Sequence, residues 1–367
     1  MSYSDDIKDL LDDLNGTLKN PNLFQKGTNS NWSDIKGWIS TGCFLLDLAM
    51  TSYDEKGEAL GGGFARGRWY EIFGPESVGK TTLYLQAMAA NANAGGLNAL
   101  IDSEARLYKP RAIKMGLDLD KVVMIDSPYL ELGVESLTQL LKKIKSRDAL
   151  RGRPLIIAWD TIANVPTKAE YEKGMYASGQ AAKARMIHEM IRDLTPHIAE
   201  SNATLLLINQ QIATMASYGK QTDTTGGSGT KYQSSARLEL GKAGVYNSAV
   251  NRDEVEGIIT RVRFVKSSLF KPMGEVEYAQ NFDSGIDDLL SIVNFSVRTK
   301  LITSSGGRYK CPEYQDTNAT GKYLRDFLDL LREDDLFVEF LKNRAKESVK
   351  EFWKKAASYA EKDKEKE

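Results

Sequence analysis

The chain has 367 residues, of which 41% are hydrophobic and 27% are charged, as in an ordinary globular protein with one large domain or two. A formal net charge of −1 excludes a uniformly basic surface, so any binding of nucleic acid must rely on local clusters of cations and on backbone amides. Two cysteines and two histidines do not supply the ligand spacing of a Cys/His zinc site, and we expect both thiols to be reduced.

The first segment predicts a short amphipathic helix. Its apolar residues recur at helical spacing, at Ile7, Leu10, Leu11, Leu14 and Leu18. A polar stretch from Lys19 to Gly37 follows, so we expect a neighbouring subunit to bury the apolar face of this helix. The segment is acidic where a signal peptide is basic, and no apolar run approaches the ~18 residues of a membrane helix. These features predict a cytoplasmic protein without a membrane partner.

Short apolar runs alternate with helical patterns from Arg68 onward. The runs are "RWYEIF", "LNALIDSE", "VVMIDSP", "PLIIAWD" and "TLLLINQ". This alternation predicts an α/β fold in which helices flank a mostly parallel, twisted sheet. Three further runs, "ARLELG", "IITRVRFVKSS" and "GEVEYAQ", lack intervening helices and predict an antiparallel extension of the sheet. After about Asp283 the pattern becomes mainly helical around a turn at Gly306 and Gly307, which predicts a small C-terminal α/β domain and a charged tail.

A phosphate-binding loop is predicted between the first strand and its helix. The sequence "GPESVGKT" satisfies G-x-x-x-x-G-K-[ST], and the flanking strand and helix argue against a plain glycine-rich turn. Its glycines let backbone N–H groups surround a phosphate at a helix N-terminus. Lys80 is expected to reach the β- and γ-phosphates, and the Thr81 hydroxyl to ligate magnesium. The predicted nucleotide-binding residues of the loop are Gly74, Pro75, Glu76, Ser77, Val78, Gly79, Lys80, Thr81 and Thr82.

Polar residues at the ends of three other strands complete the predicted site. Asp160 ends "PLIIAWD", where a carboxylate can hold the magnesium shell. Glu104, which we favour over Asp102, can orient and deprotonate the attacking water. Asn209 and Gln210 follow "TLLLIN", where an amide can hydrogen-bond to the γ-phosphate; an ordinary strand-ending turn is the alternative for this pair.

The ordered set of motifs resembles one family. The motifs are "GPESVGKTTL", "LIDSE", "IAWDTIANVPTKAE", "LLLINQ", "TTGGSGTKYQSSARLEL" and "RVRFVKSS". From about Ser40 through the C-terminal domain, the chain is similar to the RecA-family homologous recombinases, in the branch of bacterial RecA and the phage UvsX-type proteins. This resemblance implies a P-loop NTPase with a RecA-like core.

The resemblance also implies roles for individual residues. Lys80 and Thr81 are expected to bind ATP and Mg²⁺, and Asp160 to be the Walker B carboxylate. Glu104 is expected to be the catalytic base. Gln210 is expected to couple the γ-phosphate to the DNA-binding loop that follows it.

Two loops are expected to bind DNA. The first corresponds to Gln211–Gly226, a long polar segment, and it ends where Gly226 and Gly227 offer backbone N–H groups to DNA phosphates. A surface loop that is disordered in the free protein is compatible with this interpretation.

The second loop matches Tyr171–Gln180 and leads into a helix that carries Arg185 and Arg192 on nearly one face. We expect both arginines to contact the DNA backbone, although solvated surface arginines are the plain alternative. His188 lies between them, and the sequence assigns it no role.

The chain departs from the family at two places. "RFVKSSLFK" keeps Lys266, the first of two lysines that reach the neighbouring subunit's nucleotide in bacterial members, but has Ser268 in place of the second. Lys271 substitutes for it, one cation suffices, or hydrolysis is slow. Arg111 replaces the aromatic residue that stacks on adenine, and its guanidinium plane can stack instead.

The resemblance implies an ATP-dependent recombinase of bacterial or phage origin. Such a protein forms helical filaments on single-stranded DNA, pairs it with a homologous duplex and exchanges strands, aided by single-strand binding and loader proteins. A ring helicase with the same ATPase core and a nonenzymatic loading mediator remain the alternatives. The predicted parts are an oligomerisation helix and linker (1–37), the ATPase core (38–283), a small C-terminal domain (284–345) and a charged tail (346–367).

Overall fold

The computed structural model describes residues 3–17, 19, 24, 34–174, 180–213, 222–224, 227–247, 253–272, 274–314 and 320–364. The chain forms two compact units, Met1–Lys36 and Gly37–Glu367. The first unit contains α1 (Tyr3–Thr17), which confirms the helix predicted there. In the last turn of this helix, the side-chain amide of Asn15 exchanges two hydrogen bonds of 2.8 Å with the backbone of Phe24.

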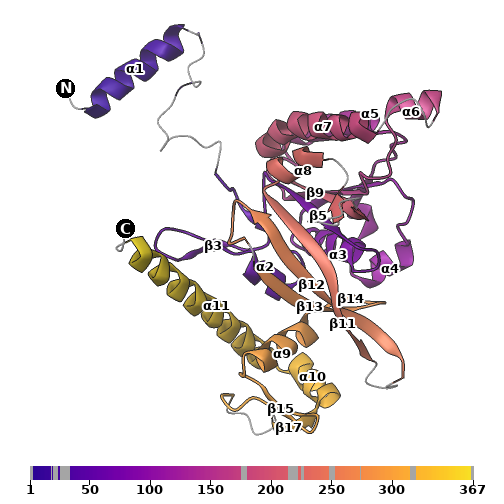
Figure 1. The fold of residues 1–367 in the computed structure, drawn as a ribbon, viewed down its shortest axis with the longest axis vertical. Helices are drawn as coiled ribbons and strands as arrows, with labels where there is room; N and C mark the ends of the chain where they lie inside the picture. The colour runs from indigo at the N-terminus through magenta and orange to yellow at the C-terminus, as the bar shows by residue number, and fades with distance from the viewer. Residues whose placement is uncertain are drawn as a thin grey trace. The chain divides into compact units, whose positions relative to one another are not determined.

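A ten-stranded sheet organises the described part of the second unit (Figure 1). Its parallel strands lie in the order β7 (Val122–Met124), β6 (Leu97–Asp102), β8 (Leu155–Asp160), β9 (Ala203–Ala213), β5 (Trp69–Gly74) and β11 (Ala236–Asn247). The antiparallel strands β12 (Val255–Ser267), β13 (Glu275–Asn281) and β14 (Gly285–Asp287) continue from β11. The predicted parallel sheet with an antiparallel extension is confirmed.

Helices cover both faces of the parallel strands, which is why these strands are continuous apolar runs. One face packs against α2 (Phe44–Ala49), α3 (Lys80–Asn93) and α4 (Lys109–Lys114). The other face packs against α5 (Leu130–Lys145) and α7 (Gln180–Ser201). Residues such as Ile72 and Trp159 are buried between these layers. The parallel register between these layers brings the carboxyl ends of β6, β8, β9 and β5 to the same edge of the sheet.

The C-terminal segment has a hydrophobic cluster of its own. It contains α9 (Asp288–Arg298), α10 (Leu324–Glu333), α11 (Asp335–Lys364) and a small sheet of β15 (Thr303–Ser305), β16 (Arg308–Lys310) and β17 (Thr320–Tyr323). The predicted turn at Gly306 and Gly307 joins β15 to β16. The helix α11 continues across residue 345, and Figure 1 shows it passing β3, where Lys350 pairs with Glu58 at 3.0 Å.

Several short elements complete the described ranges. They are the paired strands β1 (Trp38–Ile39) with β4 (Phe64–Ala65) and β2 (Ser52–Tyr53) with β3 (Ala59–Gly61), the helices α6 (Lys168–Lys173) and α8 (Gly227–Gln233), and the 3-10 turn η2 (Leu119–Lys121). Within the described ranges, no helix combines the length and the apolar character needed to cross a membrane.

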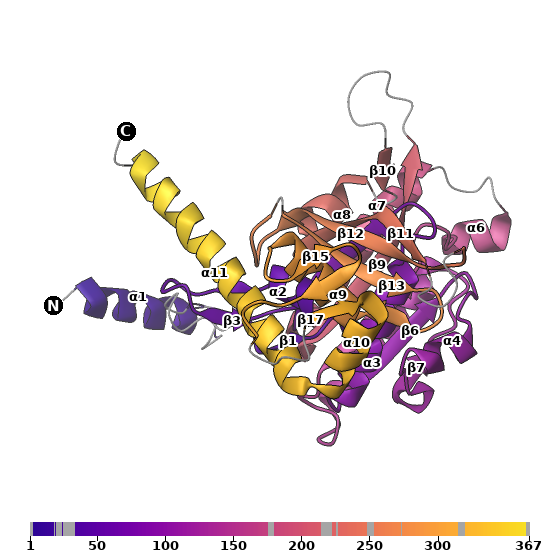
Figure 2. The ribbon, with the colours of Figure 1, turned by 90° about the horizontal axis from the view of Figure 1, so that it is seen from below.

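Both predicted loops are shorter than expected. The strand β9 continues to Ala213 and pairs antiparallel with β10 (Thr222–Thr224), as Figure 2 shows, so the ends of the segment Gln211–Gly226 form a two-stranded stem. The polar composition concealed this stem because cross-strand hydrogen bonds satisfy the backbone without a core. In the second loop, α6 extends to Lys173, and residues 175–179 lie outside the described ranges.

Candidate nucleotide-binding site

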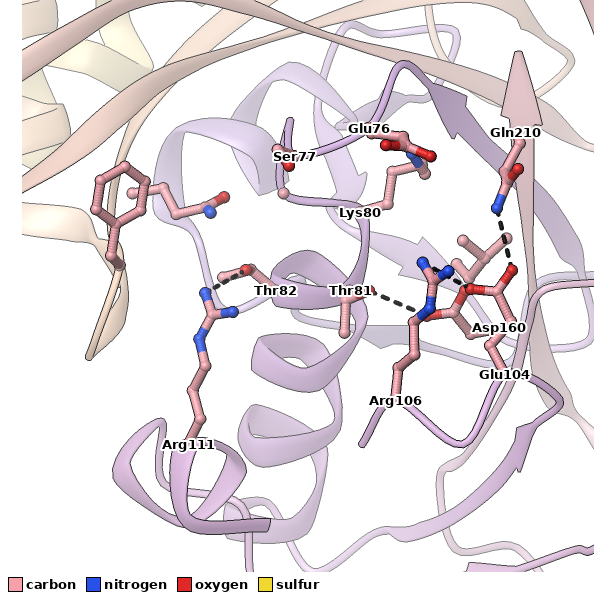
Figure 3. A pocket seen from close by; sticks show the side chains of 14 residues that line it. Glu76, Ser77, Lys80, Thr81, Thr82, Glu104, Arg106, Arg111, Asp160 and Gln210 are labelled. Carbon is pink, nitrogen blue, oxygen red and sulfur yellow. Dashed lines mark hydrogen bonds and ion pairs between the residues drawn. The ribbon is translucent and has the colours of Figure 1, made fainter. Parts of the chain in front are cut away.

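The predicted nucleotide-binding and metal-binding residues meet Glu104 and Gln210 at one edge of the sheet. The parallel register places Asp102 beside Asp160 and Gly74 beside Gln210. These strand ends and the loop after β5 surround a cavity of about 390 Å³ (Figure 3). Its lining includes the predicted residues Glu76, Ser77, Gly79, Lys80, Thr81, Thr82, Glu104, Arg111, Asp160 and Gln210. A cavity of this size suits a nucleotide-sized ligand.

The loop between β5 and α3 requires its glycines. Gly79 has a φ of +97°, and a Cβ atom there would lie 1.9 Å from Oε1 of Gln280. At Gly74 a Cβ atom would lie 2.2 Å from the carbonyl oxygen of Leu240. The backbone can therefore curl beneath a ligand only if both positions lack a side chain.

Lys80 lies within this curl. Its Nζ donates hydrogen bonds to the carbonyl oxygens of Gly74 (2.9 Å) and Pro75 (2.5 Å). Burial lowers the pKa of Lys80, while nearby carboxylates act in the opposite direction. A partly desolvated ammonium group at a helix N-terminus is a strong phosphate ligand, as the sequence predicts.

Replacing Gly79 with Ala should weaken nucleotide binding at least about tenfold, because the new methyl group forces Gln280 or the loop to move. The matched control is Gly95→Ala, where φ is +81° but no atom lies within 4 Å of the new Cβ. That variant carries similar backbone strain without the collision and should bind the nucleotide normally. Titration with a fluorescent ATP analogue measures both; equal losses in the two variants would contradict the collision.

Thr81 and Asp160 form the predicted metal-binding pair. The Thr81 hydroxyl donates to Oδ2 of Asp160 at 3.0 Å. Burial raises the pKa of Asp160, and Glu104 and Asp102 raise it further, against hydrogen bonds from Thr81 and Tyr84. A desolvated carboxylate among other acids favours a bound cation.

The protein ligands available to a metal at this point are few. In the described ranges, no group of three or more His, Cys, Asp and Glu side chains could hold a metal ion. One hydroxyl and one carboxylate nevertheless fit Mg²⁺, which takes most of its ligands from phosphate oxygens and water.

Glu104 is held by three side chains, two of which, Gln210 and Arg106, are labelled in Figure 3. Its Oε1 accepts hydrogen bonds from Nε2 of Gln210 (3.1 Å) and from Nδ2 of Asn164. Its Oε2 pairs with Nη1 of Arg106 at 2.9 Å. Sequence reasoning missed Asn164 and Arg106. The only sequence signal for them was that Asn164 lies four residues after Asp160 and Arg106 two residues after Glu104, and many residues lie that close to an acidic residue without contacting it.

Arg111 and two residues of the antiparallel extension form the other end of the cavity. Nη2 of Arg111 donates to the Thr82 hydroxyl at 3.1 Å (Figure 3). Phe282, with 46% of its surface exposed, and Gln280, with 3% exposed, also line the cavity. In the described part of the chain, Oε1 of Gln280 has no hydrogen-bond donor. An aromatic ring, a guanidinium plane and an amide are the usual contacts of a nucleobase.

A buried polar network connects this cavity to the stem of the first predicted loop. Glu71 accepts hydrogen bonds from Nδ2 of Asn209 (2.9 Å) and Nε of Arg237 (2.5 Å). Arg237 also donates to the Thr224 hydroxyl at 3.1 Å, and Asn209 accepts from the backbone N–H of Gln210. The ion pair of Glu71 with Arg237 thus joins the strand before the phosphate loop to β11, and hydrogen bonds connect it to β9 through Asn209 and to β10 through Thr224.

The predicted DNA-binding residues lie outside the cavity. Arg185 and Arg192 are exposed on α7, where they pair with Glu189 at 3.0 Å and Asp193 at 3.5 Å. The amide of Gln211 donates to Glu239 at 2.8 Å. Gly227 is the first residue of α8, and Gly226 lies outside the described residues.

Lys266 also lies away from the cavity within the same subunit. Its Nζ donates to the carbonyl oxygens of Tyr232 (2.5 Å) and Ser234 (2.7 Å) at the end of α8. Gln233 on that helix hydrogen-bonds to His188 of α7 at 2.7 Å. The structure thus gives His188 a role that the sequence did not assign, as a link between the helices that follow the two predicted loops.

Comparisons with known proteins identify similar sequences. The model of the RecA N-terminal domain matches residues 7–287. "Protein RecA" of Rhizobium leguminosarum bv. viciae is 30% identical over 342 residues, which cover 92% of this chain and 91% of the relative. "Protein RecA" of Rhizobium etli (strain CIAT 652) is 32% identical over 320 residues, 86% of this chain and 82% of the relative. "Protein RecA" of Paracoccus denitrificans is 31% identical over 314 residues, which cover 84% of this chain and 82% of the relative.

Proposed function

The chain belongs to the RecA family, and from this premise we propose that the cavity after β5 is where it hydrolyses ATP to drive DNA strand exchange. The protein is an ATP-dependent homologous recombinase of recombination and repair. It uses ATP and Mg²⁺, binds single-stranded and duplex DNA, and assembles with copies of itself. The observation that carries the proposal is the convergence of Lys80, Asp160, Glu104 and Gln210 on one cavity.

Four residues are assigned to the phosphates and the metal. Lys80 neutralises the β- and γ-phosphates, and its present carbonyl partners are weaker acceptors than phosphate oxygens. Thr81 would ligate Mg²⁺ directly, and Asp160 would hold its water shell. When bound, Mg²⁺ neutralises charge on the phosphate oxygens. Glu104 accepts the proton of the attacking water, because its carboxylate lies at the same end of the cavity as Asp160.

Gln210 couples the nucleotide to DNA. Its amide donates to Glu104 at 3.1 Å, and a γ-phosphate offers a more highly charged acceptor nearby. The residue after Gln210, Gln211, is the first residue of the stem formed by β9 and β10. A movement of the Gln210 side chain can therefore be passed directly to the segment proposed to bind DNA. The buried ion pair of Glu71 with Arg237 keeps the base of that stem fixed to the core.

The nucleobase would lie at the opposite end of the cavity. Arg111 and Phe282 contact its faces there, which gives Arg111 the stacking role of the family's aromatic residue. Gln280 also lines the cavity, where its Oε1 lies against Gly79 of the phosphate loop.

The remaining assignments concern DNA and assembly. Arg185, Arg192 and Gln211, with the backbone of Gly226 and Gly227, bind the DNA backbone without reading sequence. The amphipathic helix α1 docks on an adjacent subunit, and residues 284–345 act as a small separate domain before a charged tail.

A DNA-stimulated ATPase assay paired with a strand-exchange assay tests the function. Both activities should require ATP, Mg²⁺ and single-stranded DNA, and electron microscopy with a nonhydrolysable ATP analogue should show helical filaments. Discrete rings with unwinding of forked DNA would indicate a ring helicase instead. Normal filaments without strand exchange would indicate a loading mediator.

A further inference from the structure

The nucleotide cavity contains a cation that the predicted site does not include. Arg106 lines the cavity beside Glu104, Asp160 and Gln210 (Figure 3), at the end where the γ-phosphate of a bound nucleotide would lie. It pairs with Glu104 at 2.9 Å. A guanidinium group at this end of the cavity can contact the γ-phosphoryl group, which is the group transferred to water during ATP hydrolysis.

The backbone of Arg106 is fixed, whereas its side chain is accessible. The carboxylate of Asp102 accepts hydrogen bonds from the backbone N–H groups of Arg106 (3.2 Å) and Leu107 (2.8 Å). The side chain of Arg106 is 67% exposed, although its partner Glu104 is only 10% exposed. The Arg106 side chain is therefore open to ligands in the cavity and can exchange one anionic partner for another.

The site has a use for this cation. The resemblance to the family implies two lysines that reach the neighbouring subunit's nucleotide, and this chain has Ser268 at the second of these positions. Among the other cations that line the cavity, Lys80 is held in the phosphate loop and Arg111 lies at the base end on Thr82. Arg106 is therefore placed to supply charge where Ser268 does not.

We propose that Arg106 is a catalytic arginine acting in cis, which leaves Glu104 and binds oxygens of the γ-phosphoryl group during hydrolysis. The inference rests on the proposed ATPase function. Water attacks the γ-phosphorus and loses its proton to Glu104, while the bond from the γ-phosphorus to the bridging oxygen breaks and ADP keeps the electron pair. Negative charge spreads over the γ-phosphoryl oxygens in this step, and the fork of donors on Arg106 stabilises it.

When Arg106 moves from Glu104 to the γ-phosphate, the carboxylate of Glu104 becomes available to accept a proton. In the structure this carboxylate is paired with Arg106 and accepts hydrogen bonds from Gln210 and Asn164. Arg106 and Gln210 line the cavity and can turn to the γ-phosphate, whereas Asn164 is not part of the lining. Asn164 then remains as a positioning residue that orients Glu104 toward the water.

Arg106→Ala tests the proposal in the full-length protein on single-stranded DNA. We expect ATP affinity and filament assembly to stay within about threefold of wild type, and kcat to fall about 100-fold, as for loss of one donor to a developing charge. The readout other than activity is the affinity for ADP with aluminium fluoride and Mg²⁺, a mimic of the transferred phosphoryl group. It should fall about 100-fold while the affinity for ADP alone is unchanged.

Two further variants control the experiment. Arg106→Lys keeps the charge without the planar fork and should retain an intermediate rate. Arg151→Ala removes an arginine of similar exposure, 65%, whose ion pair with Asp148 spans 2.7 Å outside the cavity, and should change neither readout.

The outcomes separate this inference from the proposed function. Wild-type kcat and aluminium fluoride affinity in Arg106→Ala, beside a hydrolysis-deficient Glu104→Gln, would overturn the inference and leave the ATPase function intact. A loss of kcat with unchanged aluminium fluoride affinity would also overturn it, because Arg106 would then act only through Glu104. If the wild-type protein itself did not hydrolyse ATP, the proposed function would fail first.

Discussion

Glu104→Gln is expected to lower the DNA-stimulated ATPase rate about 10³-fold while ATP binding and filament assembly remain close to wild type. The amide has the size of the carboxylate, and its oxygen can still accept hydrogen bonds from Gln210 and Asn164. It cannot take a proton from water, so the loss falls on the chemical step. A fluorescent ATP analogue, electron microscopy and phosphate release measure the three properties on the same preparation.

Lys80→Ala provides the contrast within the same cavity. Removing the ammonium group leaves the phosphates without their principal cation in the loop, so ATP binding, assembly and hydrolysis should all fail together. Equal losses of ATP binding in Lys80→Ala and Glu104→Gln would show that Glu104 supports the nucleotide rather than the water. The assignment of the base would then be wrong.

The parts of the site that the sequence predicted are those with a local cause. A strand, a glycine-rich turn and a helix are neighbours in the chain, so "GPESVGKT" reveals the phosphate loop directly. Parallel strands align their carboxyl ends, which is why Asp160, Glu104 and Gln210 could be placed near Lys80 from strand patterns. The hydrogen bond of Thr81 to Asp160 joins residues 79 positions apart in the sequence for this reason.

The residues that the sequence missed reach the cavity through non-local or irregular geometry. Gln280 and Phe282 come from the antiparallel extension, whose alternating pattern gives no sign that it borders the nucleotide. Arg106 returns to Glu104 because Ala105 has a φ of +52°, a turn that no periodicity encodes. Asn164 meets Glu104 across 60 residues. Such contacts depend on how two strand-to-loop transitions are oriented, and composition does not specify this.

The strands at the ends of the segment Gln211–Gly226 were not predicted, because their polar residues show no apolar alternation. The pairing of Gln211 with Thr224 makes them a stem nevertheless, and the Arg237 hydrogen bond to Thr224 anchors that stem to the buried Glu71. A buried arginine that pairs with a carboxylate can thus order polar strands that have no apolar face of their own.

Lys266 has partners within its own subunit that differ from those its expected role in trans requires. In the single subunit its Nζ lies on two carbonyl oxygens at the end of α8, a favourable position for a cation at a helix C-terminus. Burial and the nearby Arg237 lower its pKa, so its charge gains from an anionic partner. The resemblance implies that this lysine reaches the nucleotide of the neighbouring subunit, and we propose that role for Lys266. To act there it must leave α8, the helix that follows the segment proposed to bind DNA.

Lys266→Ala should therefore lower the ATPase rate about 10³-fold in filaments, as for loss of a cation supplied in trans, and leave the affinity of dilute monomers for ATP unchanged. Ser268→Lys, which restores the second lysine that the resemblance implies, should raise the ATPase rate of filaments, and Lys271→Ala shows whether Lys271 already takes that role.

The decisive test mixes Lys266→Ala with Glu104→Gln subunits. Neither variant is active alone, but roughly a quarter of the head-to-tail interfaces in a 1:1 filament combine an intact Glu104 with an intact Lys266 of the neighbour. Recovery of hydrolysis in the mixture would show that Lys266 acts on the nucleotide of the neighbouring subunit. A mixture as inactive as its components would contradict this role and leave Lys266 with its contacts to α8 in its own subunit.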